Sequence, residues 1–89
     1  MQVQYRKRFL KDLKKLNRQP IYEKVFKLVF TVLPQAPTLR DIAGVKAMKG
    51  HSNRYRIRIG DYRVGIQIHG DTVDVMCVLH RREFYRYFP

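Results

Sequence analysis

The feature of this 89-residue sequence that most constrains its fold is a strict alternation of apolar and basic residues around a Gly-Asp pair. The order is Tyr-Arg-Ile-Arg-Ile over residues 55–59, then Gly60-Asp61, then Tyr-Arg-Val-Gly-Ile-Gln-Ile over residues 62–68. A period of two on both sides of a two-residue turn predicts a β-hairpin. Its two faces differ in chemistry, so we call them the apolar face and the arginine face.

The arginine face carries an arrangement that weakens a sheet. If Gly60 and Asp61 form the loop, Arg58 lies opposite Arg63, and like charges in opposite positions destabilise a pair of strands. A bound polyanion would offset this cost, because planar guanidinium groups match phosphate oxygens. A simpler interpretation is ordinary alternation, in which the long arginine side chains only extend into water. Of the two interpretations, we favour the anion-binding site.

A third strand follows a second two-residue turn, Gly70-Asp71, and continues the same period over residues 72–79. If that turn is also tight, Cys77 and Leu79 fall on the apolar face and His80 falls on the arginine face. A slip of one residue would move every side chain of the strand to the other face.

The N-terminal half predicts helices. After a possible short edge strand at residues 2–5, apolar residues recur at helical spacing over residues 6–16, with lysines and arginines between them. These cations can form a solvated face or contact RNA, and the sequence does not choose between the two. Pro20 is well placed to start a second helix that ends just before Pro34. A short link between the two helices predicts an antiparallel pair.

The expected fold is α+β and forms a single domain over residues 1–89. Two N-terminal antiparallel helices pack on one face of a small, largely antiparallel β-sheet of three to five strands. The basic and aromatic segment at residues 81–89 can add one helical turn. We expect the arginine face to stay open.

The charge balance indicates the kind of partner. The chain has 19 Lys and Arg against 7 Asp and Glu, a net charge of +12, which favours nucleic acid. No apolar run approaches the roughly 20 residues of a membrane-spanning helix, and no signal peptide is recognisable, so we expect a cytoplasmic protein without a membrane partner. Cys77 is the only cysteine, and the carboxylates are scattered, so we expect no disulfide, metal site or cofactor.

Three segments together resemble a known family. They are Met48-Lys49-Gly50, the Tyr-Arg-Ile-Arg hairpin from Tyr55 to Val64, and His-Arg-Arg-Glu-Phe-Tyr from His80 to Tyr85. With the basic helix pair before them, they resemble the RelE/ParE superfamily of bacterial toxins, and the RelE branch in particular. The resemblance covers nearly the whole chain.

This resemblance implies a metal-independent endoribonuclease that cleaves messenger RNA, usually on the ribosome, and is inhibited by a cognate acidic antitoxin. DNA contact would be only indirect, through the antitoxin. The family's catalytic positions fall on matching residues of this chain: Arg56, Arg58, Arg63, Arg81 and Tyr85. Further basic residues are expected to bind RNA: Lys46, Lys49, Arg54 and Arg82.

One departure from the family affects the chemistry. RelE-type toxins often have lysines where this chain has Arg56 and Arg58, and arginine is a poor proton donor because its pKa exceeds about 12. His80, with a reference pKa of about 6.5 for its residue type, is the best-suited replacement, and Tyr85 is the other candidate. Tyr85 can also stack on a base or simply cover the end of the sheet. Arg82 is an alternative to Arg81.

Two other functions remain open. A ParE-like toxin on the same scaffold would inhibit DNA gyrase by binding it. A catalytically silent basic module would act with its antitoxin as a DNA-binding repressor and would need phosphate contacts without proton transfer.

Overall fold

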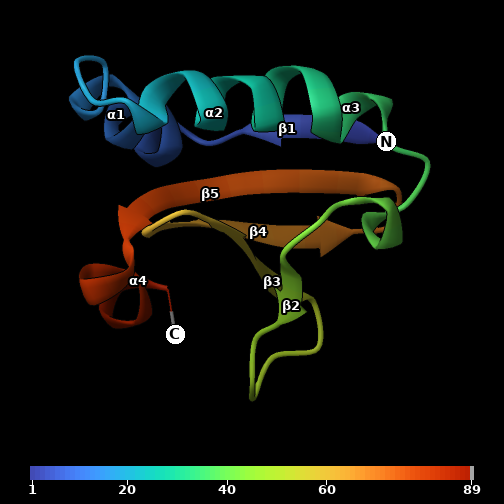
Figure 1. Ribbon diagram of the computed structural model, residues 1–89. Helices are drawn as coiled ribbons and strands as arrows, with labels where there is room; N and C mark the ends of the chain where they lie inside the picture. The colour runs from blue at the N-terminus through green and yellow to red at the C-terminus, as the bar shows by residue number, and fades with distance from the viewer. Residues whose placement is uncertain (89) are drawn as a thin grey trace.

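A five-stranded sheet between two helical layers forms the frame of the fold (Figure 1). The computed structural model describes residues 1–88. Its strands are β1 (Gln2–Tyr5), β2 (Val45–Ala47), β3 (Arg54–Ile59), β4 (Tyr62–His69) and β5 (Thr72–His80), and its helices are α1 (Lys7–Lys15), α2 (Ile21–Lys27), α3 (Leu33–Gln35) and α4 (Arg81–Tyr87). Single helical turns of other types lie at Leu28–Val32 (π) and Leu39–Asp41 (3-10).

The strand order is β1-β5-β4-β3-β2. The three pairs among β2 to β5 are antiparallel, and the short edge strand β1 runs parallel to β5, so the sheet is mixed. The two parallel strands are joined by a long connection, which contains α1, α2 and α3 and then β2, β3 and β4.

The β3–β4 hairpin has the predicted register. Arg58 pairs with Arg63, and Ile57 pairs with Val64. The turn begins at Gly60, whose φ of +57° is a left-handed conformation that favours glycine. The prediction of two chemically different faces is therefore confirmed at this hairpin.

The predicted register of β5 is correct only for its first half. A β-bulge interrupts the β4–β5 ladder, because Gly65 pairs with Cys77 while the next residue, Ile66, pairs with Val75. Met76 is the extra residue and has no partner in the ladder. Such a bulge shifts the alternation of all later residues in the strand by one position.

The second half of β5 therefore has its faces exchanged. Cys77 and Leu79 lie opposite Gly65 and Arg63 on the arginine face, and His80 lies opposite Tyr62 on the apolar face. The prediction that His80 shares a face with the arginines is wrong, as is the prediction that Cys77 and Leu79 join the main core.

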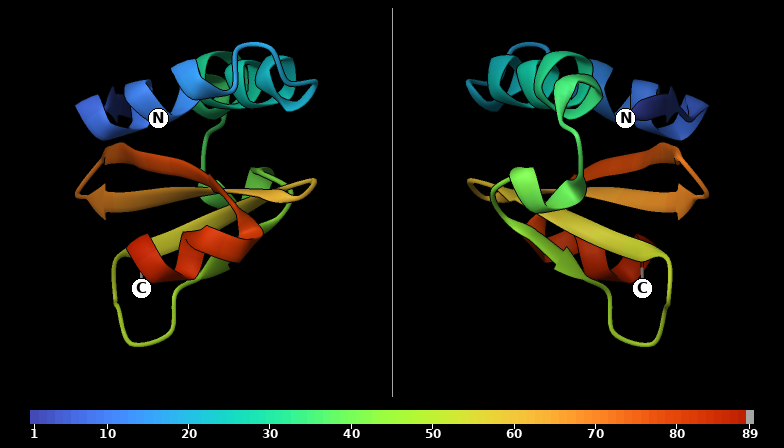
Figure 2. Two further views of the ribbon diagram at one scale, coloured as in Figure 1. Left: turned by 90° about the vertical axis from the view of Figure 1, so that its left-hand side faces the viewer. Right: turned by 90° about the vertical axis from the view of Figure 1, so that its right-hand side faces the viewer.

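The apolar face is covered by the first three helices (Figure 2). Their buried side chains pack on those of β3, β4 and β5 in one core: Phe9, Leu13, Val25, Val29, Leu33, Ile57, Val64, Ile66, Val73, Val75 and Val78. The expected second helix is interrupted by the π turn. Pro34 does not end it, because it lies in the first turn of α3, where a missing N–H is tolerated.

The arginine face is covered in part, contrary to the expectation that it stays open. Helix α4 lies on it, on the opposite side of the sheet from the other helices (Figure 1). Phe84 and Phe88 pack with Met48 and Cys77 into a second small core. Burial raises the pKa of the Cys77 thiol to about 11, so this residue packs as a small core hydrophobe.

Gly65 is required by this second core. A Cβ atom at position 65 would lie 2.8 Å from Cδ2 of Phe88 and 2.9 Å from Sγ of Cys77. The space beside Gly65 is filled by the ring of Phe88. This contact fixes the position of α4 over the sheet.

We expect Gly65→Ala to destabilise the protein by about 1–3 kcal/mol, because the added methyl group overpacks a filled core. Thermal or urea unfolding measures this loss. Gly50→Ala is the control, since no atom lies within 4 Å of a Cβ there, although its φ of +86° gives that variant a backbone cost of its own. A Gly65→Ala variant as stable as the parent would show that Phe88 moves without cost.

Candidate functional site

A groove on the arginine face brings together residues from β2, β3 and α4. Lys46 of β2 pairs with Arg56 of β3, so both side chains lie on the same face. The ring of Tyr85 reaches the groove from α4. The groove has a volume of about 290 Å3 and is lined by Lys46, Ala47, Met48, Lys49, Arg56 and Tyr85.

Backbone carbonyls hold two of the arginines in place. Nη1 of Arg56 donates a hydrogen bond of 2.9 Å to the carbonyl of Gly44, just before β2. Nη1 of Arg63 donates to the carbonyls of Gly60 and Tyr62, each at 2.9 Å. These bonds restrict the guanidinium groups of Arg56 and Arg63 before any ligand arrives. Arg58, which lies between them on the same face, is exposed.

Helix α4 presents two predicted residues one turn apart. The backbone N–H of Arg81 donates to the carbonyl of Asp61 at 2.8 Å, and Nε of Arg81 lies 3.9 Å from Oδ1 of Asp61. Tyr85 lies four residues later, on the same side of the helix. Its side chain is 52% exposed and its ring packs edge-on against Phe84. The hydroxyl of Tyr85 is therefore accessible to a ligand.

His80 has a different setting. Its Nδ1 accepts a hydrogen bond of 3.2 Å from the backbone N–H of Arg82, which makes it the N-cap of α4. Its ring also packs edge-on against Tyr62, with ring centres 5.3 Å apart. His80 does not line the groove. Its contacts instead give it a structural role at the start of α4.

The residues expected to bind RNA separate into two groups. Lys46 and Lys49 line the groove. Arg54 lies on the same face but is engaged by the chain, with its guanidinium 4.9 Å from the centre of the Phe88 ring and its Nε donating to Gln67 at 3.3 Å. Arg82 is exposed on α4.

The electrostatic character of the groove is uniformly positive. Within residues 1–88, ion pairs join Arg6 to Asp74, Arg8 to Asp12, and Arg81 to Asp61, and Nε2 of His69 also lies 3.2 Å from Oδ2 of Asp74. None of them involves a cation of the groove or of the adjacent arginine pair: Lys46, Lys49, Arg56, Arg58 and Arg63. These unneutralised charges attract a polyanion.

Within residues 1–88, no three His, Cys, Asp or Glu side chains gather closely enough to hold a metal ion. No helix in this part of the chain has the length and apolar character needed to cross a membrane.

Known proteins share both the sequence and this fold. The family described as ParE toxin of the type II toxin-antitoxin system, parDE, matches residues 3–85. Toxin RelE3 of Methanocaldococcus jannaschii is 41% identical over 90 residues, covering all of both chains. Putative toxin RelE1 of the same organism is 35% identical and covers 91% of this chain and 89% of its own length.

Solved structures agree with the sequence matches. The RelB-RelE antitoxin-toxin complex of Methanococcus jannaschii contains a chain with 38% identity and a TM-score of 0.78, covering 97% of this chain and 99% of that one. The RelBE2 toxin-antitoxin complex of Mycobacterium tuberculosis gives 28% identity, a TM-score of 0.70, and coverage of 90% and 96%. This chain therefore belongs to the RelE/ParE superfamily and is a RelE-like toxin of a type II toxin-antitoxin system.

Proposed function

We propose that this toxin is an endoribonuclease that cleaves messenger RNA without a metal ion, acting on the ribosome in the cytoplasm. The observation that carries the proposal is the groove in which Lys46, Arg56 and Tyr85 meet. No carboxylate within residues 1–88 forms an ion pair with Lys46 or Arg56. A groove with fixed positive charge and an accessible hydroxyl has the groups that transfer of a phosphoryl group requires.

The proposed reaction begins with attack of a ribose 2′-oxygen on the adjacent phosphorus. The bond from phosphorus to the 5′-oxygen breaks, which leaves a 2′,3′-cyclic phosphate and a free 5′-hydroxyl. The 2′-hydroxyl proton goes to a base, and the departing 5′-oxygen receives a proton from an acid. Arg56, Arg58, Arg63 and Arg81 would stabilise the negative charge that develops on the phosphoryl oxygens.

Two groove residues carry groups suited to the proton transfers. We assign the phenolate form of Tyr85 as acceptor of the 2′ proton, which regenerates the phenol, and the Lys46 ammonium as donor to the 5′-oxygen. The structure supports these assignments over His80, because Tyr85 and Lys46 share the groove with Arg56 whereas His80 caps α4. Lys49 and the outer arginines, Arg54 and Arg82, would bind the RNA backbone.

The proposed protein partner is a RelB-type antitoxin, since the relatives from Methanococcus jannaschii and Mycobacterium tuberculosis were solved as toxin-antitoxin complexes. Such an antitoxin would be acidic, to match the net charge of +12. It would suppress cleavage, and DNA binding by the complex would come from the antitoxin. A complex that still cleaves messenger RNA at the full rate would contradict this inhibition.

Cleavage of a defined messenger RNA tests the proposed function. The purified toxin is incubated with the RNA, with and without programmed ribosomes, in the presence of EDTA, and the new RNA ends are mapped. We expect cyclic phosphate and 5′-hydroxyl ends. No cleavage in either condition would refute the proposal.

A ParE-like function remains the second candidate, because the matching family model is that of a ParE toxin. A gyrase supercoiling assay separates the two functions. Inhibition of gyrase without RNA cleavage would establish the ParE-like activity.

We expect Arg63→Ala and Arg81→Ala each to lower the cleavage rate about 30-fold, because each removes roughly 2 kcal/mol of charge stabilisation from the transition state. Stability should change little, since neither side chain belongs to the two buried cores. Single-turnover rates and thermal unfolding measure the two effects. Full growth arrest by both variants at equal expression would mean that the site is wrongly placed.

A further inference from the structure

A contact between α1 and α4 crosses the edge of the sheet at β5. The two helices lie at the same end of the sheet but on opposite sides of it (Figure 1). Helix α1 belongs to the layer over the main core, whereas α4 covers the second core. Because the two helices are far apart in the sequence and separated by the sheet, contact between them depends on side chains at this edge.

The edge of β5 is open along its second half because β1 is short. The last pair between the two strands joins Tyr5 to Val75, and the chain then turns into α1. Asp12 of α1 takes the place of a strand beyond this pair, since its Oδ2 accepts a hydrogen bond of 3.2 Å from the backbone N–H of Val78. Only 5% of Asp12 is exposed, so a carboxylate is buried at the sheet edge.

This buried carboxylate requires a partner, because an unpaired charge away from water is strongly destabilising. Arg8 lies one helical turn earlier, and its Nε donates to the two carboxylate oxygens of Asp12 at 3.0 Å and 3.2 Å. These bonds hold the guanidinium group at the edge of the sheet. Its Cζ lies 5.3 Å from the centre of the Tyr87 ring on α4, which is a cation–π contact. Asp12, Arg8 and Tyr87 therefore join α1 to α4, and we call them the edge clamp.

The edge clamp matters for α4 because a helix of seven residues is too short to be stable without tertiary contacts. The start of α4 is held by the hydrogen bond from the N–H of Arg81 to the carbonyl of Asp61. Its last turn is held by the second core and by the contact of Tyr87 with Arg8. Tyr85 lies between these two attachments, so its place in the groove on the arginine face depends on both.

The charges of the edge clamp act on the core beneath α4. Burial is the main cause of the raised pKa of the Cys77 thiol, the Asp12 carboxylate raises this pKa further, and the Arg8 guanidinium lowers it. Both charged groups are thus close enough to influence the interior of the second core. Cys77 is also the only cysteine of the chain, so its thiol is a site-specific probe of α4.

We propose that Arg8 is a positioning residue for RNA cleavage, which acts through Tyr87 to hold Tyr85 in the groove on the arginine face. The proposal rests on the proposed ribonuclease function and adds to it a residue from the opposite helical layer. Arg8 does not line that groove. Loss of its side chain should therefore move α4 and leave the phosphate-binding cations of β2 and β3 in place.

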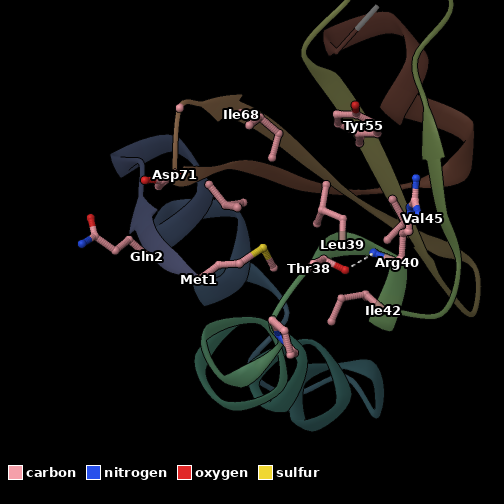
Figure 3. Close-up of a pocket in the computed structure, with 13 residues that line it drawn as sticks. Met1, Gln2, Thr38, Leu39, Arg40, Ile42, Val45, Tyr55, Ile68 and Asp71 are labelled. Atoms are coloured by element: carbon pink, nitrogen blue, oxygen red, sulfur yellow. Dashed lines mark hydrogen bonds between the residues drawn. The ribbon is translucent and has the colours of Figure 1, made fainter.

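The test compares Arg8→Met with two control variants that also remove one positive charge. Arg6→Met is the matched control, because Arg6 is likewise a half-exposed arginine paired with a buried carboxylate, that of Asp74, and this pair includes no residue of α4. Arg40→Met controls for the lost charge alone. Arg40 lines a larger groove beyond the end of α3, to which no residue of α1 or α4 contributes (Figure 3).

We expect Arg8→Met to lower the single-turnover cleavage rate at saturating RNA about tenfold, because a displacement of even about 1 Å moves Tyr85 away from the reacting atoms. RNA affinity should equal that of Arg40→Met. Dithiobis-nitrobenzoate should label Cys77 at least about threefold faster, since loss of the cation–π contact lets α4 open more often. Loss of Arg8 by itself raises the pKa of this thiol and slows labelling, so faster labelling reports opening.

Arg8→Lys should restore most of the cleavage rate, because it keeps a cation beside Asp12 and Tyr87. Both control variants should match the parent in cleavage rate at saturating RNA and in labelling of Cys77. Faster labelling in Arg8→Met with a parent-like cleavage rate would overturn the positioning role.

Tyr87→Leu keeps the test decisive if Arg8→Met fails to fold, because it removes the ring and leaves the pair of Arg8 with Asp12 intact. It should reproduce both changes, and the double variant should be no worse than Arg8→Met alone. Parent-like cleavage by Tyr87→Leu, additive losses in the double variant, or equal changes in Arg6→Met would overturn the proposal. Absence of cleavage by the parent would instead refute the ribonuclease function, and labelling of Cys77 would still show whether Arg8 holds α4.

Discussion

Tyr85→Phe is expected to lower the single-turnover rate of RNA cleavage at least 100-fold, since general acid-base groups contribute about 10²–10⁴ to such rates. The substitution removes one oxygen atom and keeps the ring that packs against Phe84. The side chain is 52% exposed, so stability and RNA affinity should be nearly unchanged. Rapid-quench cleavage of a ribosome-bound messenger RNA measures the rate, and filter binding measures affinity.

His80→Gln is the comparison that separates the two candidates for proton transfer. Glutamine can still accept a hydrogen bond near the start of α4, so we expect a modest loss of stability and a rate within tenfold of the parent. The pH profile should stay the same in shape. Three results together would assign the proton transfer to His80 instead. They are a parent rate that follows histidine titration, a flat pH profile in His80→Gln, and a normal rate in Tyr85→Phe.

The hairpin was predictable because its own residues determine its register. Gly60 and Asp61 define a two-residue turn, and the alternation on both sides leaves one register that buries the apolar side chains. The short edge strand β1 was also predicted, although its parallel pairing with β5 depends on contacts distant in the sequence.

The β5 register was not predictable in the same way, since its second half is apolar on both faces. Met76, Cys77, Val78 and Leu79 follow one another without a polar residue to fix the alternation. A continuous apolar run is typical of a strand buried on both sides, and this was the available signal that a further element covers the arginine face. Phe84 and Phe88 of α4 supply that cover.

The arrangement of the candidate site depends on strand pairing. Four of the residues that the sequence predicts for the site line one groove: Lys46, Lys49, Arg56 and Tyr85. The proximity of Lys46 to Arg56 was missed, because it requires the pairing of the three-residue strand β2 with β3. That pairing matters for the chemistry, since a lysine now lies beside an arginine that cannot readily give up a proton.

Lys46→Met is expected to lower the cleavage rate about 100-fold, because it removes both a positive charge and the proposed proton donor. Lys46→Arg should restore RNA affinity, because a guanidinium group keeps the positive charge. It should reach less than a tenth of the parent cleavage rate, because a guanidinium group holds its proton too tightly to donate it. Single-turnover rates at saturating RNA separate these effects from binding.

Lys49 provides the matched control, because it lines the same groove and is proposed only to bind RNA. Lys49→Met should weaken RNA affinity, and Lys49→Arg should recover both affinity and rate. A Lys46→Arg variant that cleaves as fast as the parent would show that charge alone is needed at position 46. The leaving oxygen would then take its proton from Tyr85 or from water, and the groove would act by electrostatic stabilisation through Arg56, Arg58, Arg63 and Arg81.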